Sequence, residues 1–270
     1  MDSVWNQIID FPLGKRKAKP REKGLTMVID KGLGLRELHD LFEIAGEHLD
    51  FLKLGFGTLL LYNETLIRAK VALCQEYEAQ IYPGGTLTEI ALLQGCYEAY
   101  LEKAAKIGFK TIEISDGTIA LPVEKREYCI KRAVKAGFNV LTELGKKSPE
   151  EDLSPQILWA QGQRDLANGA WKVIIEARES GKGIGIYDEK GEIVEDKLED
   201  YLKNCGDPNK IIWEAPLKDQ QVNLIKRFGP EVNLGNIQPQ ELLALETLRT
   251  GLRSDTFRLA KTFTDKSHCS

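Results

Sequence analysis

The chain has 270 residues, of which 42% are hydrophobic and 29% charged, and its formal net charge is −4 at pH 7. This composition is that of an ordinary soluble globular protein, and the acidic balance gives no sign of a nucleic-acid-binding surface. No apolar run approaches the roughly 20 residues of a membrane-spanning helix, and the first ten residues lack the regions of a secretory signal. The five cysteines are scattered, without the spacing of a zinc site or a disulfide framework. We therefore expect a cytoplasmic protein with no membrane or nucleic-acid partner.

The segment Lys15–Arg21 is locally basic and precedes the first apolar run. It has the composition of an arm that binds phosphate or nucleic acid, but the net charge favours the simpler interpretation, a solvated lead-in to the first strand.

Eight short apolar runs recur along the chain, each with the length and flanking residues of a buried strand. They are Leu25–Ile29, Phe51–Leu52, Ala79–Tyr82, Thr111–Ile114, Val140–Leu144, Val173–Ile175, Ile211–Trp213 and Val232–Leu234. Helical patterns lie between and after them, at Gly34–Leu49, Asn63–Tyr77, Thr86–Ile107, Val123–Ala136, Pro155–Ala167, Lys197–Lys203, Asp219–Phe228 and Pro239–Leu252. This alternation predicts an α/β fold, a single TIM (β/α)8 barrel, whose usual length of about 250 residues matches the chain.

An open doubly wound sheet is the alternative, but it often carries a GxGxxG loop after a strand, and neither that motif nor a P-loop is present. The glycine-rich string Gly181–Gly185 leads into a hairpin-like turn instead. We interpret it as a small insertion after strand six that could lie over the site as a lid. The predicted organisation is an N-terminal extension (1–22), the barrel (23–257) and a C-terminal tail (258–270).

The predicted strands end in charged or small polar residues, and the carboxyl ends of barrel strands meet at one face. The candidate acids are Asp30, Glu113, Asp116, Glu143, Glu176 and Glu214. The candidate cations are Lys31, Lys53, Lys146, Lys147, Arg178 and Lys182. Backbone or side-chain amides that could meet an anion are at Gly84, Gly85, Asn233 and Asn236. Such a set predicts one shared polar site for an anionic substrate.

None of the three histidines follows a predicted strand. A histidine general base, a Ser-His-Asp triad and a histidine-ligated metal are therefore not expected. Carboxylates without histidine suit Mg²⁺, which prefers oxygen ligands. The alternative is that these carboxylates form fixed ion pairs with the neighbouring lysines.

In the pair Lys146-Lys147 each ammonium disfavours the other's charge, so one of them could act as an acid or base, or form a Schiff base.

Ten blocks in order together resemble the phosphosulfolactate synthase family, over about Lys23 to Phe257. They are Leu25–Gly32, Leu54–Thr58, Tyr82–Leu87, Glu113–Gly117, Leu141–Lys147, Ile174–Gly183, Glu214–Pro216, Gln220–Val222, Val232–Ile237 and Leu245–Thr256. The resemblance implies a TIM-like barrel that uses Mg²⁺ to add sulfite to phosphoenolpyruvate, giving (2R)-phospho-3-sulfolactate. In methanogens this family supplies coenzyme M biosynthesis.

For that reaction we assign Lys147 as the acid at C2, with Lys146 as second choice. The metal-side carboxylates are Glu113, Glu143 and Glu176, followed by Glu214 and Asp116. The substrate-binding residues are Lys31, Lys53, Arg178, Lys182, Asn233, Asn236, Gly84 and Gly85.

Two other hypotheses stay open: a non-catalytic protective protein like the similar plant heat-stress-associated 32 kDa proteins, and another barrel lyase or aldolase acting on a phosphorylated acid. Apolar positions such as Leu92, Leu93 and Tyr97 could pack on the barrel or join subunits of a homo-oligomer.

Overall fold

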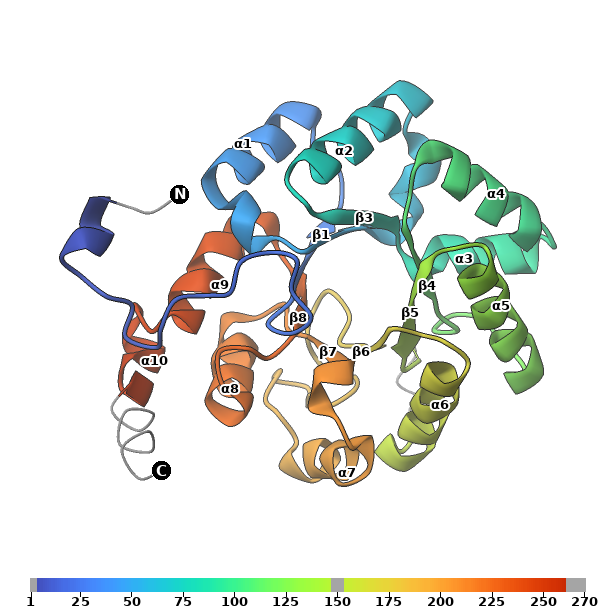
Figure 1. The fold of residues 1–270 in the computed structure, drawn as a ribbon. Helices are drawn as coiled ribbons and strands as arrows, with labels where there is room; N and C mark the ends of the chain where they lie inside the picture. Colours follow the sequence, from blue (N-terminus) through green and yellow to red (C-terminus); the bar gives the residue numbers. More distant parts are fainter. Residues whose placement is uncertain (1–3, 147–152, 261–270) are drawn as a thin grey trace.

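The computed structural model describes residues 4–146 and 153–260, and these form one barrel with helices around it (Figure 1). Eight parallel strands make the sheet. They are β1 (Thr26–Asp30), β2 (Phe51–Leu54), β3 (Gln80–Pro83), β4 (Thr111–Ile114), β5 (Asn139–Leu144), β6 (Lys172–Ile175), β7 (Ile211–Glu214) and β8 (Leu234–Ile237). The strand order is β3-β2-β1-β8-β7-β6-β5-β4, and β3 also lies beside β4. The barrel is therefore nearly closed, and the predicted (β/α)8 fold is confirmed.

Helices follow the strands and cover the outside of the barrel (Figure 1). They are α1 (Leu35–Ala45), α2 (Glu64–Glu76), α3 (Gly85–Leu93), α4 (Tyr97–Ile107), α5 (Val123–Lys135), α6 (Pro155–Ala167), α7 (Glu195–Cys205), α8 (Lys218–Phe228), α9 (Leu242–Arg249) and α10 (Ser254–Phe257). Asn63 caps the start of α2, because its side chain accepts a hydrogen bond from the Leu66 N–H and satisfies a donor of the first turn. None of the helices in the described ranges is long and apolar enough to cross a membrane.

Two predicted boundaries were wrong. The single helix predicted over Thr86–Ile107 is two helices, because the chain turns at Gly95, whose φ of 68° is readily adopted by glycine. The last strand begins at Leu234 rather than Val232, which shifts the residues at its carboxyl end to Asn236 and Ile237.

The barrel interior has an apolar layer toward the amino-terminal ends of the strands and a charged layer toward their carboxyl-terminal ends. Alternate residues of a strand point the same way, so positions i and i+2 both face inward. On β2, β5 and β7 the first inward residue is apolar (Phe51, Leu141 and Ile212) and belongs to the small buried cluster inside the barrel. The second inward residue, two positions later, is charged (Lys53, Glu143 and Glu214), and Lys53 is ion-paired with both glutamates. The sequence pattern of these strands thus places the charges at the carboxyl-terminal end.

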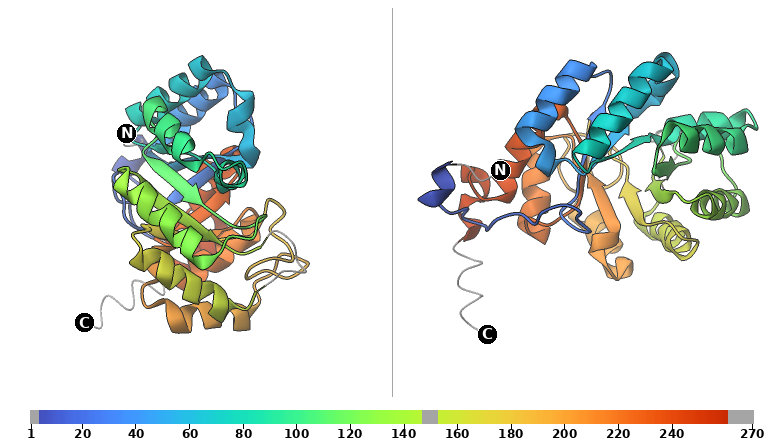
Figure 2. Two further views of the ribbon diagram at one scale, coloured as in Figure 1. Left: turned by 90° about the vertical axis from the view of Figure 1, so that its right-hand side faces the viewer. Right: turned by 45° about the horizontal axis from the view of Figure 1, so that its top comes forward.

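The opposite end of the barrel is covered by the N-terminal segment, the dark blue trace at the left of the left-hand view in Figure 2. Lys19 donates hydrogen bonds to the carbonyl oxygens of Gly46 and Tyr77, and Arg21 is ion-paired with Asp50 at 3.0 Å. The interpretation of Lys15–Arg21 as a solvated lead-in was therefore incomplete, because part of this basic segment is fixed beneath the barrel.

Candidate active site

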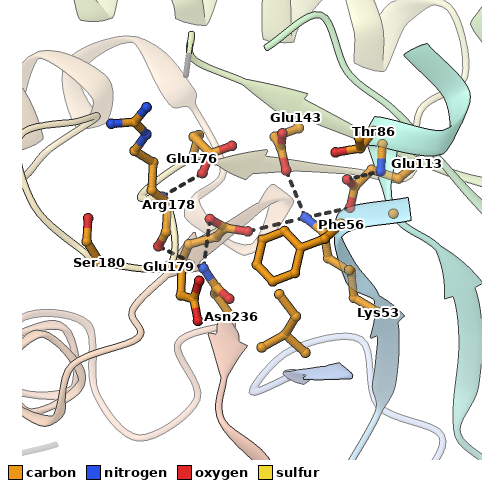
Figure 3. Close-up of a pocket in the computed structure, with 15 residues that line it drawn as sticks. Lys53, Phe56, Thr86, Glu113, Glu143, Glu176, Arg178, Glu179, Ser180 and Asn236 are labelled. Atoms are coloured by element: carbon orange, nitrogen blue, oxygen red, sulfur yellow. Dashed lines mark hydrogen bonds and ion pairs between the residues drawn. The ribbon is translucent and has the colours of Figure 1, made fainter. Parts of the chain in front are cut away.

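A cavity of about 390 Å³ opens at the carboxyl-terminal end of the strands (Figure 3). Its walls come from the ends of six strands and from the loops that follow them. The lining residues are Ile29, Lys53, Gly55, Phe56, Gly84, Gly85, Thr86, Glu113, Glu143, Glu176, Arg178, Glu179, Ser180, Glu214 and Asn236. Nine of the predicted site residues are in this set: Lys53, Gly84, Gly85, Glu113, Glu143, Glu176, Arg178, Glu214 and Asn236.

The centre of the cavity is one ammonium group among carboxylates. Lys53 Nζ lies 2.8 Å from Glu143 Oε2, 3.1 Å from Glu113 Oε2 and 3.3 Å from Glu214 Oε1. Glu176 is buried beside Glu143 and Glu214. Four carboxylates against one ammonium would leave an excess of negative charge if all were ionised, which a buried site tolerates poorly. The cluster therefore favours taking up protons or a further cation.

The excess of buried acidic groups raises the pKa values of the carboxylates and of Lys53. Burial, only partly opposed by the attraction of Lys53, raises the pKa of Glu113 to about 7. Burial and repulsion from Glu143 and Glu214 raise the pKa of Glu176 well above 4.5, and burial also raises that of Glu214. Burial lowers the pKa of Lys53, but the three carboxylates outweigh it and raise the value well above 10.5. Lys53 is thus a permanent cation.

The start of α3 fixes the position of one carboxylate. The backbone N–H of Gly85 donates to Glu113 Oε1 at 2.6 Å, and Thr88 Oγ1 donates to the Glu113 carbonyl oxygen at 2.7 Å. A Cβ atom at Gly85 would lie 2.8 Å from Glu113 Oε1, so only glycine lets the helix come this close. Gly84 and Gly85 were predicted to meet an anion of the substrate, and in the structure Gly85 meets an anionic side chain of the protein itself.

The loop after β6, residues 176–194, carries the polar residues at the mouth. Arg178 has a left-handed backbone (φ 60°), and its N–H donates to Glu176 Oε1 at 2.5 Å. Its guanidinium forms no ion pair with any residue in the described ranges, and it extends away from Glu176 in Figure 3. Glu179 at the rim is paired with Lys31 at 2.5 Å, so that lysine reaches the loop rather than the cavity floor. Lys182 is exposed and does not line the cavity.

The β4 and β5 ends hold a second charged group beside the cavity. Arg126 of α5 is ion-paired with Asp116 and Asp165, at 3.0 and 2.7 Å. Lys146 Nζ donates to the Asp116 carbonyl oxygen at 2.5 Å and lies 3.3 Å from Asp116 Oδ2. Asp116 and Lys146 therefore bind each other and do not line the cavity. Lys147, assigned as the acid, lies outside the described residues.

The two asparagines predicted at the end of strand eight lie at different ends of β8. Asn236 lines the cavity and donates to the Arg178 carbonyl oxygen at 2.9 Å. Asn233 precedes β8, where its side chain accepts from the Leu25 N–H and donates to the Ile211 carbonyl oxygen. Those partners lie at the amino-terminal ends of β1 and β7, so assigning Asn233 to substrate binding was wrong. The cause is the late start of β8.

Phe56, Thr86 and Ser180 line the cavity but were not assigned to it from the sequence. The signal for Phe56 was its place between Gly55 and Gly57 directly after a strand, which is typical of a tight turn. Thr86 and Ser180 follow the glycines and the arginine that the sequence had selected.

A nearly closed parallel barrel with a charged cavity at the carboxyl-terminal face defines an enzyme of the TIM-barrel class. Among solved structures, 3-hexulose-6-phosphate synthase aligns with a TM-score of 0.51 and 16% identity, covering 88% of this chain and 96% of that chain, which shows the shared fold alone.

Residues 14–255 match the family model described as (2R)-phospho-3-sulfolactate synthase (ComA). The chain is 48% identical to the phosphosulfolactate synthase of Methanothermobacter thermautotrophicus over 249 residues, covering 92% of this chain and 96% of that protein. It is 44% identical to that of Methanocaldococcus jannaschii, covering 87% of this chain and 94% of that protein. The chain belongs to the phosphosulfolactate synthase family.

Proposed function

We propose that this enzyme uses Mg²⁺ to add sulfite to C3 of phosphoenolpyruvate, forming a carbon–sulfur bond and giving (2R)-phospho-3-sulfolactate. The observation that carries the proposal is the cluster of Lys53 with Glu113, Glu143, Glu176 and Glu214 at the floor of the cavity, in a chain of this family. Sulfite is itself a good nucleophile, so the protein needs no covalent nucleophile. It needs to hold two anions together and to manage the negative charge and the proton that follow.

The residues present fit Mg²⁺ by their chemistry. The four acidic groups at the floor, Glu113, Glu143, Glu176 and Glu214, all offer oxygen ligands, and they are buried around the single ammonium of Lys53. Elsewhere in the described part of the chain, His39, Asp40 and Glu43 form a tight group of metal-ligand types, but that group is exposed on α1. The cavity carboxylates are spaced around Lys53 instead. Mg²⁺ takes one or two carboxylates and completes its shell with water and substrate, so a full cage is not required.

We assign Glu143 and Glu176 as the residues that hold the ion, because these neighbouring carboxylates repel each other and both are buried. When bound, Mg²⁺ supplies positive charge close to the substrate carboxylate, where charge accumulates as sulfite attacks C3. Glu113 is already fixed by Gly85 and Lys53, so its role is to hold the ammonium in place. Lys53 then contributes a permanent cation beside the developing charge.

Arg178 is the residue best placed to bind an anionic group of the substrate. It lines the cavity, carries no ion pair with a described residue, and its guanidinium can bind phosphate or carboxylate with two hydrogen bonds. Thr86 and Ser180 add hydroxyl donors on the two sides of the mouth. This division puts the anionic substrate at the rim and the charge-stabilising groups at the floor.

The proton added at C2 needs a separate donor. Lys53 is unsuited to this, because a pKa raised well above 10.5 makes an ammonium a poor acid near neutrality. Lys146 is bound to Asp116 and to the Ile119 carbonyl oxygen. Both observations favour Lys147 as the acid, as the sequence suggested.

Phosphorus NMR of the protein with phosphoenolpyruvate, sulfite and Mg²⁺ tests the function directly. We expect the phosphoenolpyruvate signal to be replaced by a new phosphate-ester signal only when sulfite and metal are both present, with an EDTA control. If folded protein binds phosphoenolpyruvate without a new signal, the acceptor is not sulfite. If it neither binds nor reacts, the non-catalytic alternative is favoured.

A further inference from the structure

Backbone strain in this protein is concentrated at the cavity. In the described ranges, the residues other than glycine with positive φ are Phe56 (55°), Glu78 (53°), Arg178 (60°) and Asn236 (57°). Three of these four line the cavity, and only Glu78 lies elsewhere, in the turn between α2 and β3. A left-handed backbone is unfavourable for any residue with a Cβ atom, and such conformations collect at functional sites when the surrounding structure maintains them.

Phe56 is the most unusual of the three. Asparagine adopts the left-handed region several times more often than other residues, whereas for a bulky side chain it is an outlier. The strain is not offset by burial, because 55% of the Phe56 surface is exposed. Gly57 continues the left-handed turn with φ 68°. Directly after β2, this turn sets the ring in the cavity beside Lys53, in front of the carboxylate cluster (Figure 3).

A strained and half-exposed phenyl ring contributes little to the stability of the free protein, but a ligand in the cavity would cover it. Phosphoenolpyruvate has two anionic groups joined by a short, planar, unsaturated carbon unit. The charged groups of the cavity can bind the anionic groups, and among the described residues that line this cavity Phe56 is the only aromatic one. A flat ring is suited to pack against a flat unsaturated unit and to keep water from it.

We propose that Phe56 is a substrate-positioning residue, whose ring packs on the unsaturated carbons of the bound substrate and is held in the cavity by the left-handed turn Phe56-Gly57. This inference rests on the proposed function and adds the residue that selects a planar substrate. The left-handed backbone at Phe56 destabilises the free protein slightly, but it holds the ring where the substrate binds.

The test compares Phe56→Gly, Phe56→Leu and the matched control Glu78→Gly. Both glycine variants relieve a left-handed residue, but only the first removes a ring from the cavity. Thermal unfolding, steady-state kinetics and calorimetric binding of phosphoenolpyruvate are measured for each. For Phe56→Gly we expect a Tm equal to or above that of the wild type, and a roughly tenfold increase in KM and Kd for phosphoenolpyruvate, equivalent to about 1.4 kcal/mol.

Phe56→Leu is expected to retain most of the affinity, because leucine still covers the substrate carbons. Glu78→Gly is expected to raise Tm without changing KM. An unchanged KM and Kd in Phe56→Gly would overturn the proposal, since the ring would then have no part in substrate binding. A Tm that falls together with the affinity would also overturn it, since the ring would then stabilise the fold. If wild-type protein binds phosphoenolpyruvate but does not add sulfite, the proposed function fails and the Kd comparison still decides the role of Phe56. If the wild type binds no phosphoenolpyruvate, both fail.

Discussion

The ammonium of Lys53 lies 2.8 Å from Glu143 Oε2, and the two residues come from β2 and β5, which are separated by β3 and β4 around the barrel wall. Each is the second inward residue of its strand, above an apolar residue of the inner cluster. The pair therefore marks the level at which the barrel interior changes from packed core to chemical site. Because Glu113 and Glu214 contact the same ammonium, Lys53 holds three strand ends together by charge.

Replacing Lys53 by methionine should damage both stability and activity. The variant leaves four buried carboxylates without a cation, and breaking a buried ion pair in this way costs about 3–5 kcal/mol. The loss should be larger at pH 8 than at pH 5, where protons can neutralise the carboxylates. Chemical unfolding at the two pH values measures it, with Lys31→Met as the control, because an exposed ion pair such as Lys31–Glu179 contributes only about 0–1 kcal/mol. Equal losses at both pH values would contradict the model of an uncompensated cluster.

The stability of the metal-free protein should depend on pH through Glu113. Its folded pKa is raised to about 7 from 4.5, so the folded protein retains the proton to a higher pH than the unfolded chain does. Protonated Glu113 therefore stabilises the fold at low pH, and this stabilisation is lost as the pH rises from about 4.5 to about 7. The raised pKa values of Glu176 and Glu214 act in the same direction. Glu113→Gln should remove part of this slope in thermal unfolding across pH 5–8.

Mg²⁺ should stabilise the protein more as the pH rises. Metal binding needs deprotonated carboxylates, so protons compete with the ion at low pH, and the raised pKa of Glu176 extends this competition to higher pH than for an ordinary carboxylate. We expect the rise in Tm caused by millimolar MgCl₂ to be small at pH 5 and larger at pH 8. Glu143→Gln and Glu176→Gln should abolish the rise, whereas Glu43→Gln, in the exposed group on α1, should retain it. A rise that persists in both cavity variants would show that the ion binds elsewhere.

Replacing Arg178 should weaken substrate binding and leave the fold intact. We choose Arg178→Asn, because asparagine tolerates the left-handed backbone at this position. Hydrogen bonds to charged groups contribute about 1.5–3 kcal/mol, so we expect KM for phosphoenolpyruvate to rise by roughly 10–100-fold. Arg178→Lys should recover part of the loss, since it keeps the charge without the two-point geometry. Kinetics with an unchanged KM would place the anionic group elsewhere in the cavity.

Most of the site could be predicted because parallel strands of a barrel bring their carboxyl ends to one face. Five charged residues of the site each lie at or just beyond the carboxyl end of an apolar run: Lys53, Glu113, Glu143, Glu176 and Glu214. Their shared location therefore followed from the strand pattern alone. The strand pattern does not predict which charged groups pair with one another. Only the three-dimensional spacing shows that Lys53 neutralises carboxylates and that Lys146 is bound to Asp116.

The errors arose where local signals were weak. Asn233 and Asn236 are three residues apart around the end of the predicted strand, and a shift of the strand start by two positions sends Asn233 to the opposite end of the barrel. The break at Gly95 lies inside a long apolar and helical pattern, where a single glycine is often tolerated. Phe56 was missed because aromatic residues after a strand are usually core, and its left-handed backbone is set by the fold around it.

The two neighbouring lysines after β5 provide the sharpest test of the mechanism. Lys147→Ala should reduce kcat by about 10²–10⁴-fold, the usual contribution of a general acid, with little change in Tm. Lys146→Ala should do the reverse, because its Nζ donates to the Asp116 and Ile119 carbonyl oxygens and its loss removes contacts between the β4 and β5 ends. A charge-assisted hydrogen bond contributes about 1.5–3 kcal/mol, so a measurable fall in Tm is expected with most of kcat retained. If Lys147→Ala keeps nearly wild-type turnover and Lys146→Ala loses it, the proton comes from Lys146, which must then leave Asp116 during the reaction.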